Sequence, residues 1–117
     1  MEKIVAQGLL YDFYGELLTV HQRQIYEGIV YENLSLGEIA EEFGITRQAV
    51  HDIVKRCDKA LSEYEEKLQL VGKFMRIKEQ IGKIEQLTTL YEQDVCSDKK
   101  VYCGKLRQLS KEILNEL

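Results

Sequence analysis

The chain has 117 residues, enough for a domain of ordinary size with a hydrophobic core. It contains no proline, which fits an all-helical chain. Its formal net charge is −4, which is unusual for a protein that binds phosphates over a broad surface. There is no long apolar run and no charged segment followed by an apolar one. We therefore expect neither a membrane span nor a signal peptide.

Cysteines and histidines offer no recognisable metal or catalytic site. Cys57, Cys96 and Cys103 are odd in number and lack paired metal-ligand spacing, so a reducing cytoplasm is the expected setting. His21 and His51 fall in different predicted helices, without a serine, cysteine or carboxylate grouping beside them. No glycine-rich phosphate loop occurs. We expect no enzyme activity, no cofactor and no metal.

Periodicity predicts two helices in the first third of the chain, over 3–18 and 20–31. Thr19 and Gln22 have the spacing of a capping box, which places a chain break before the second helix. The aromatic residues are predicted to be core, with base stacking by Tyr11 or Tyr31 as the alternative. The predicted buried stripe of the first helix is Ile4, Val5, Leu9, Phe13, Leu17 and Leu18, thickened by Tyr11 and Tyr14, and that of the second is Ile25, Tyr26, Ile29 and Val30.

The stretch from Leu34 to Ala60 has the spacing of two helices joined by one tight turn. Ser35 and Glu38 form a second capping-box sequence, which predicts a helix over 36–43. Gly44 can leave that helix in a left-handed conformation, and Thr46 can cap a helix over 47–70. The spacing is that of a helix-turn-helix. Its apolar positions are Ile39, Ala40, Phe43, Ile45, Ala49, Val50, Ile53 and Val54.

Polar side chains are predicted to face outward at the start of the 47–70 helix. In a helix-turn-helix protein this end enters the major groove of DNA. Arg47 suits guanine and Gln48 suits adenine, whereas Lys55 and Arg56 lie two turns later, where a helix can pass the phosphate backbone. An ordinary helical hairpin with a solvated charged face is the alternative. The predicted nucleic-acid-binding residues are Thr46, Arg47, Gln48, His51, Asp52, Lys55 and Arg56.

The region from Leu17 to Leu61 resembles region 4 of sigma factors, the domain that reads the −35 promoter element. It is more closely similar to the small bacterial YlxM-like family of helix-turn-helix proteins. The resemblance implies an all-α, sigma-region-4-like bundle with a long C-terminal helical extension. Genes of that family commonly neighbour those of the signal recognition particle GTPase and its receptor, which implies a regulatory role in that pathway. The similarity rests on D-F-Y-G-E-L-L-T (Asp12–Thr19), S-L-G-E-I-A-E-E-F-G-I-T-R-Q-A-V (Ser35–Val50), I-V-K-R (Ile53–Arg56) and Y-E-E-K-L (Tyr64–Leu68).

A heptad rhythm of apolar residues continues beyond the helix-turn-helix. Such a stripe must pack on the N-terminal helices, on the C-terminal segment or on a second copy of the chain. Gly72 and Gly82 are each unfavourable in a helix interior by about 1 kcal/mol, so we expect a bend or break near Gly72. The stripe consists of Val50, Val54, Cys57, Leu61, Tyr64, Leu68 and Val71.

Two further helical segments are predicted after Val71, separated by a polar loop over Gln93 to Lys100. Their apolar faces indicate additional domain core or a homodimer, and we expect the homodimer because helix-turn-helix proteins commonly bind operators as dimers. The predicted organisation is a helix-turn-helix domain over 1–70 and a helical extension over 71–117. The apolar faces are Ile81, Ile84, Leu87 and Tyr91, then Tyr102, Leu106, Leu109, Ile113 and Leu117.

The distribution of charge leaves two functional hypotheses. Residues 1–34 have a net charge of −3, residues 35–60 have −1, and residues 61–117 are balanced. Only 46–60 is positive, with four basic and two acidic side chains, which predicts a small phosphate-contacting patch. One hypothesis is a regulator that binds double-stranded DNA weakly or with a partner. The other is a protein- or RNA-binding accessory factor of the signal recognition particle pathway, with the helix-turn-helix as a scaffold.

Overall fold

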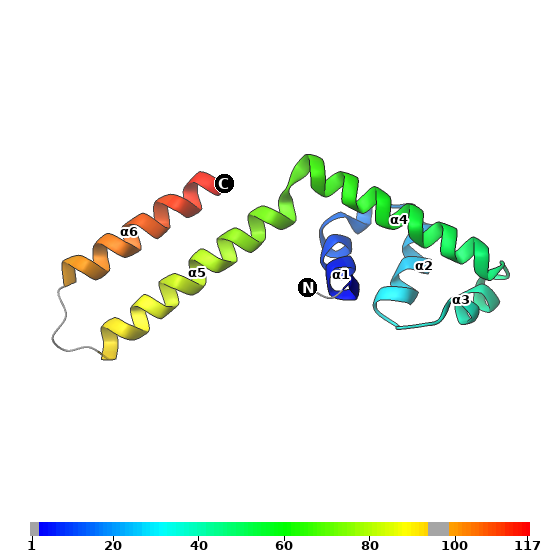
Figure 1. Cartoon of the computed structure of the whole chain (residues 1–117), viewed down its shortest axis with the longest axis horizontal. Helices are drawn as coiled ribbons and strands as arrows, with labels where there is room; N and C mark the ends of the chain where they lie inside the picture. Colours follow the sequence, from blue (N-terminus) through cyan, green and yellow to red (C-terminus); the bar gives the residue numbers. More distant parts are fainter. Residues whose placement is uncertain (1–2, 94–98) are drawn as a thin grey trace. The chain divides into compact units, whose positions relative to one another are not determined.

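The computed structural model describes residues 3–93 and 99–117, and over these ranges it contains helices and no strand (Figure 1). The all-α fold predicted from the sequence is confirmed. No helix in the described ranges is both long enough and apolar enough to span a membrane. The chain divides into two compact units, Met1–Val71 and Gly72–Leu117. The helices are α1 (Lys3–Tyr14), α2 (Val20–Val30), α3 (Leu36–Phe43), α4 (Arg47–Leu68), α5 (Leu70–Gln93) and α6 (Lys99–Glu116), with a 3-10 turn at Gly15–Leu17.

Capping residues determine where α2, α3 and α4 begin. Thr19 accepts a hydrogen bond from the backbone N–H of Gln22, and Ser35 accepts one from Glu38. In both cases the residue three positions on accepts from the backbone N–H of the cap, which completes the capping box. Thr46 caps α4 through its side-chain oxygen. The three predicted caps are confirmed.

The core of the first unit forms where α4 packs against α1, α2 and α3 (Figure 1). The apolar stripe of α4 supplies one side of this core, although Leu68 at its end is 48% exposed. The sequence left three possible partners for this stripe: the N-terminal helices, the C-terminal segment and a second copy of the chain. In the structure the N-terminal helices cover most of it. The tyrosine-rich cluster contains Tyr11, Tyr14, Leu18, Tyr26, Cys57 and Leu61, and the aliphatic cluster contains Ile25, Ile39, Ala40 and Val50.

The buried face of α1 differs from the predicted one. Tyr11 and Tyr14 are buried, and α1 ends at Tyr14 instead of continuing to Leu18. Most of the aliphatic stripe predicted for this helix is exposed, although Leu18 is buried and Leu9 is partly buried. The exposed members are Ile4, Val5, Phe13 and Leu17.

Hydroxyl partners explain why the tyrosines take the inner face of α1. The Tyr11 hydroxyl donates to Glu27 of α2, and the Tyr14 hydroxyl donates to Glu65 of α4, each over 2.5 Å. Each tyrosine thus buries a large ring and still satisfies its hydroxyl, which a buried phenol requires. Both bonds also connect α1 to another helix of the first unit. The helical spacing of the aliphatic residues did not predict these two hydrogen-bond partners.

The break after α4 lies at Gln69, and Gly72 is within α5. Gln69 has a left-handed backbone, with φ 58° and ψ 27°. The first residues of α5 are hydrogen-bonded to Tyr14 of α1 and Glu65 of α4. The Leu70 N–H donates to the Tyr14 hydroxyl, and the Val71 N–H donates to the Glu65 carboxylate, both over 3.0 Å. These bonds satisfy donors that a helix start leaves unpaired. Tertiary contacts thus place the break, which the glycine pattern predicted only approximately.

The second unit is an antiparallel pair of helices, α5 and α6 (Figure 1). Arg76 of α5 forms an ion pair with Glu116 of α6 over 2.8 Å. At the other end the rings of Tyr91 and Tyr102 meet edge to face, with centroids 5.3 Å apart. The predicted loop ran from Gln93 to Lys100, but Gln93 is the last residue of α5, and Lys99 and Lys100 are the first residues of α6. Residues 94–98 lie outside the described ranges.

Replacing Gly44 with valine is expected to destabilise the first unit by about 1–2 kcal/mol, because Gly44 has φ +67° and a β-branched residue resists that conformation. Beyond the adjoining backbone, nothing lies within 4 Å of the position of a Cβ on Gly44, so the loss would come from the backbone and not from a clash. Urea denaturation measures it. Gly44→Asn is the control and should lose less, since asparagine tolerates this region. Equal stability of Gly44→Val and wild type would contradict the turn geometry.

Candidate nucleic-acid interface

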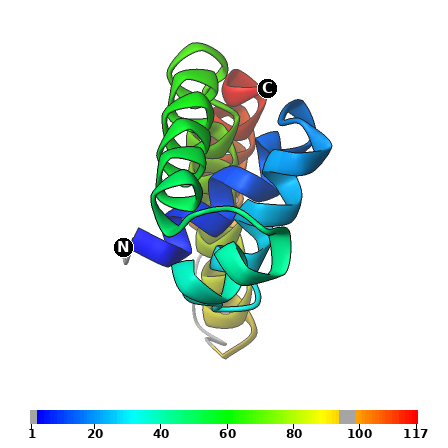
Figure 2. The same ribbon diagram turned by 90° about the vertical axis from the view of Figure 1, so that its right-hand side faces the viewer.

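The α3–turn–α4 segment forms the corner on which the interface would be built (Figure 2). Gly44 ends α3 in the left-handed conformation, and the N–H of Ile45 donates to the carbonyl of Ala40 over 3.0 Å. Ile39 and Val50 lie buried in the same cluster beneath this corner. The corner is therefore anchored to the core, and α4 begins at it.

The predicted site residues lie on one helix, but they differ in their surroundings. Thr46 is the cap of α4, and its side-chain oxygen is already bonded to the backbone of that helix. Five of the others are exposed, while His51 is partly buried. The exposed residues are Arg47, Gln48, Asp52, Lys55 and Arg56.

Arg47 and Gln48, the two predicted base-reading residues, each contact a neighbour in the free protein. The Arg47 guanidinium lies over Gly37 of α3, where an added Cβ would be 3.0 Å from its Nε. The Gln48 amide donates to Oδ1 of Asp52 over 3.0 Å. Both side chains are exposed, so neither contact is protected from water. Base contact would require Arg47 to leave α3 and Gln48 to reorient.

His51 sits at the edge between the exposed and packed faces of α4. It lines a hollow together with Ile29, Leu36 and Val54. Its Nδ1 is buried without a hydrogen-bond partner and lies 3.7 Å from Oδ1 of Asp52, beyond hydrogen-bond distance. Although 44% of the His51 side chain is exposed, its Nδ1 is therefore closed to a ligand.

Asp58 is turned toward the core of the first unit, which changes the charge of the exposed face. Its carboxylate accepts from the Tyr26 hydroxyl over 2.5 Å and from the Gln7 amide over 2.9 Å. Over 46–60 this leaves Asp52 as the one exposed carboxylate. It is accompanied by four exposed cations, Arg47, Lys55, Arg56 and Lys59. The outward face of this helix is thus more positive than its composition indicates.

Burial shifts the titration of two groups beneath this face. Burial and the hydrogen bond to Asp58 raise the pKa of Tyr26 well above its usual value. Burial, with a smaller contribution from Asp58, raises the pKa of Cys57 to about 11. Cys57 is fully buried, as its place in the apolar stripe predicted. It is a core residue and not a reactive thiol.

Sequence reasoning missed the structural role of Asp58 and the place of Gly37 under Arg47. Asp58 follows Val54 by four residues and precedes Leu61 by three, which puts it beside the apolar stripe and could have indicated an inward carboxylate. Nothing in the residue spacing indicated that the Arg47 guanidinium would lie over Gly37. Within the described ranges no group of three histidine, cysteine, aspartate or glutamate residues could hold a metal ion.

Comparisons with known proteins agree with this geometry. The family described as "Putative helix-turn-helix protein, YlxM / p13 like", UPF0122, matches residues 1–101. A UPF0122 protein of Desulforamulus reducens is 49% identical over 92 residues, covering 79% of each chain. Another, from Bacillus cereus strain AH187, is 47% identical over 87 residues, covering 74% of this chain and 79% of its own. The protein therefore belongs to the YlxM/p13-like UPF0122 family of helix-turn-helix proteins.

Proposed function

We propose that the protein is a cytoplasmic regulator, not an enzyme, that binds double-stranded DNA through the exposed face at the start of α4. The observation that carries the proposal is the charge over 46–60, where four exposed cations accompany a single exposed carboxylate. The caps and the left-handed Gly44 support it, since they build the corner from which a recognition helix projects. The proposed contacts are Thr46, Arg47, Gln48, His51, Asp52, Lys55 and Arg56.

Base reading and phosphate binding are expected to separate along α4. Gln48→Ala should weaken binding to the preferred site by about 1–3 kcal/mol and relax preference at one base pair. Lys55→Ala should weaken binding to all sequences nearly equally and reduce the salt slope by about 0.9. Titrations of selected and scrambled duplexes at two salt concentrations measure both effects.

Lys67→Ala is the matched control, because Lys67 is an exposed lysine in the last turn of the same helix. It should change neither the base preference nor the salt slope. Wild-type protein without any sequence preference, unaffected by replacing Arg47 or Gln48, would end the DNA-reading proposal.

The second candidate is a protein- or RNA-binding accessory factor of the signal recognition particle pathway. The net charge of −4 favours it, because the field of a negatively charged protein repels the phosphates of DNA. The neighbour contacts of Arg47 and Gln48 also favour it, since DNA would have to displace both. In that case the duplex titrations should show no sequence preference, and the α4 variants should leave partner binding unchanged.

We also propose that the protein forms a homodimer. With most of the α4 stripe covered inside the first unit, the proposal now depends on aliphatic side chains of the second unit. Ile81, Leu114 and Leu117 are 47%, 69% and 84% exposed. A dimer would bury such side chains. Sedimentation equilibrium at tens of micromolar should give the mass of a dimer, and a monomer mass would remove this proposal without affecting DNA reading.

A further inference from the structure

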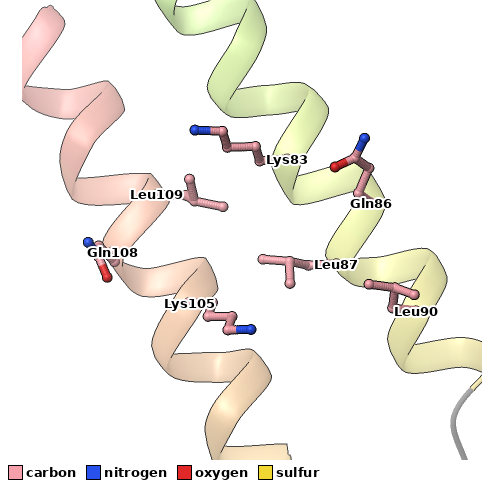
Figure 3. A pocket seen from close by; sticks show the side chains of 7 residues that line it. All are labelled: Lys83, Gln86, Leu87, Leu90, Lys105, Gln108 and Leu109. Carbon is pink, nitrogen blue, oxygen red and sulfur yellow. The ribbon is translucent and has the colours of Figure 1, made fainter.

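One side of the α5–α6 hairpin carries an open groove of about 310 Å³ (Figure 3). Both helices of the second unit line it. The side chains of Leu87 and Leu109 point toward one another from opposite helices, and Leu90 lies beside Leu87 along α5. Leu90 is 52% exposed. The groove therefore has an apolar floor that is open to solvent.

The hairpin leaves most of its apolar surface uncovered. Among the described residues of the second unit, Leu109 is the one side chain that is buried. Two helices share a single seam, so each keeps apolar positions at the margins of that seam exposed. A third helix laid into the groove would cover these positions, as in recognition of an amphipathic helix by a groove.

Lysines give the groove a positive rim. Lys83 of α5 and Lys105 of α6 point into the gap, and the remaining lining residues are leucines and glutamines, without a carboxylate. Glu79 lies 3.9 Å from Lys83, but both side chains are exposed, so this contact is weak. Lys105 has no ion-pair partner in the described part of the chain. The rim therefore favours an acidic occupant.

We propose that this groove binds an amphipathic helix of a partner protein. Its apolar stripe would cover Leu87, Leu90 and Leu109, and its carboxylates would lie beside Lys83 and Lys105. The charges disfavour a second copy of this chain, because symmetric pairing of two grooves would bring together two lysines from each copy and no lining carboxylate. The contact is independent of DNA reading, since the groove lies wholly in the second unit.

A synthetic helical peptide tests the proposal on the full-length protein. The probe has leucine at i, i+3, i+4 and i+7 with glutamate on both flanks, and a second peptide carries lysine in place of glutamate. In fluorescence anisotropy the wild-type protein should bind the glutamate peptide at least about tenfold more tightly than the lysine peptide. The double variant Lys83→Glu/Lys105→Glu should reverse this preference.

Lys78→Glu/Lys111→Glu is the matched control, because these exposed lysines lie on the same two helices and do not line the groove. It should keep the wild-type preference, and circular dichroism should show that both double variants remain helical. Equal affinity for the two peptides, binding of neither, or an unchanged preference in Lys83→Glu/Lys105→Glu would overturn the proposal. A wild-type dimer that Leu90→Asp converts to a monomer would assign the groove to a second copy instead.

Discussion

Replacing Tyr26 with alanine is expected to lower the free energy of unfolding by about 3–5 kcal/mol, the range for truncation of a fully buried aromatic side chain. Tyr26 is 0% exposed and lies in the cluster shared by α1, α2 and α4. Its ring stacks on that of Tyr11 with centroids 5.6 Å apart. The substitution would open a cavity where three helices meet and remove the hydroxyl that Asp58 accepts from. Urea denaturation followed by circular dichroism measures the loss.

Two variants separate the ring from the hydroxyl. Tyr26→Phe keeps the ring and should lose about 1.5–3 kcal/mol, because a partly buried carboxylate loses one of its donors. Val20→Ala removes a side chain that is 69% exposed and should change stability by less than about 0.5 kcal/mol. If Tyr26→Ala were no more damaging than Val20→Ala, the position of Tyr26 in the core would be wrong.

Local signals in the sequence were sufficient for the helix-turn-helix itself. Each capping residue acts on a backbone N–H within its own first turn, and Gly44 acts through its own backbone. Such features depend on neighbours a few residues away, so their spacing predicts them directly. The predicted ends of α3 and the start of α4 are confirmed for this reason.

Hydrogen-bonded pairs of residues far apart along the chain could not be predicted from the sequence. The inner face of α1 is set by Tyr11 and Tyr14, whose hydroxyl partners lie 16 and 51 positions away along the chain. The break at Gln69 depends on Tyr14, which receives the N–H of Leu70. A periodicity argument detects apolar residues, but it carries no information about which polar atom will satisfy a buried hydroxyl.

At the candidate interface, too, local features were predictable from the sequence and long-range contacts were not. The identity of the exposed residues followed from helix periodicity, and α4 presents Arg47, Gln48 and Lys55 to solvent as expected. The place of Asp58 beside the apolar stripe could indicate an inward carboxylate, but it could not indicate the partners, which are Gln7 of α1 and Tyr26 of α2. Net charge counted along a helix therefore differs from the charge that the helix presents. Here the difference makes the exposed face more positive.

The tyrosine–carboxylate pairs also predict that the protein loses stability at alkaline pH. The pKa values of Tyr11, Tyr14 and Tyr26 are raised, first by burial and then by a hydrogen-bonded carboxylate. The pKa of Tyr31 is raised by burial and by its bond to Asp12, although Tyr31 is 53% exposed, so solvent screening reduces its share. Burial raises the pKa of Cys57 from 9.0 to about 11.

A raised pKa in the folded state means that the folded protein keeps its proton at a pH where the unfolded chain has released it. Stability from these groups is complete below the unfolded pKa values of 9.0 for the thiol and 10.0 for the phenols, and it falls as pH rises beyond them. Each such group contributes a slope of up to about 1.4 kcal/mol per pH unit. We expect the free energy of unfolding in urea to begin falling above pH 9 and to fall more steeply above pH 10. Tyr26→Phe should show a shallower fall, because phenylalanine has no phenol to ionise. If the free energy of unfolding stayed level or rose between pH 9 and pH 11, the tyrosines would not be held as the structure places them.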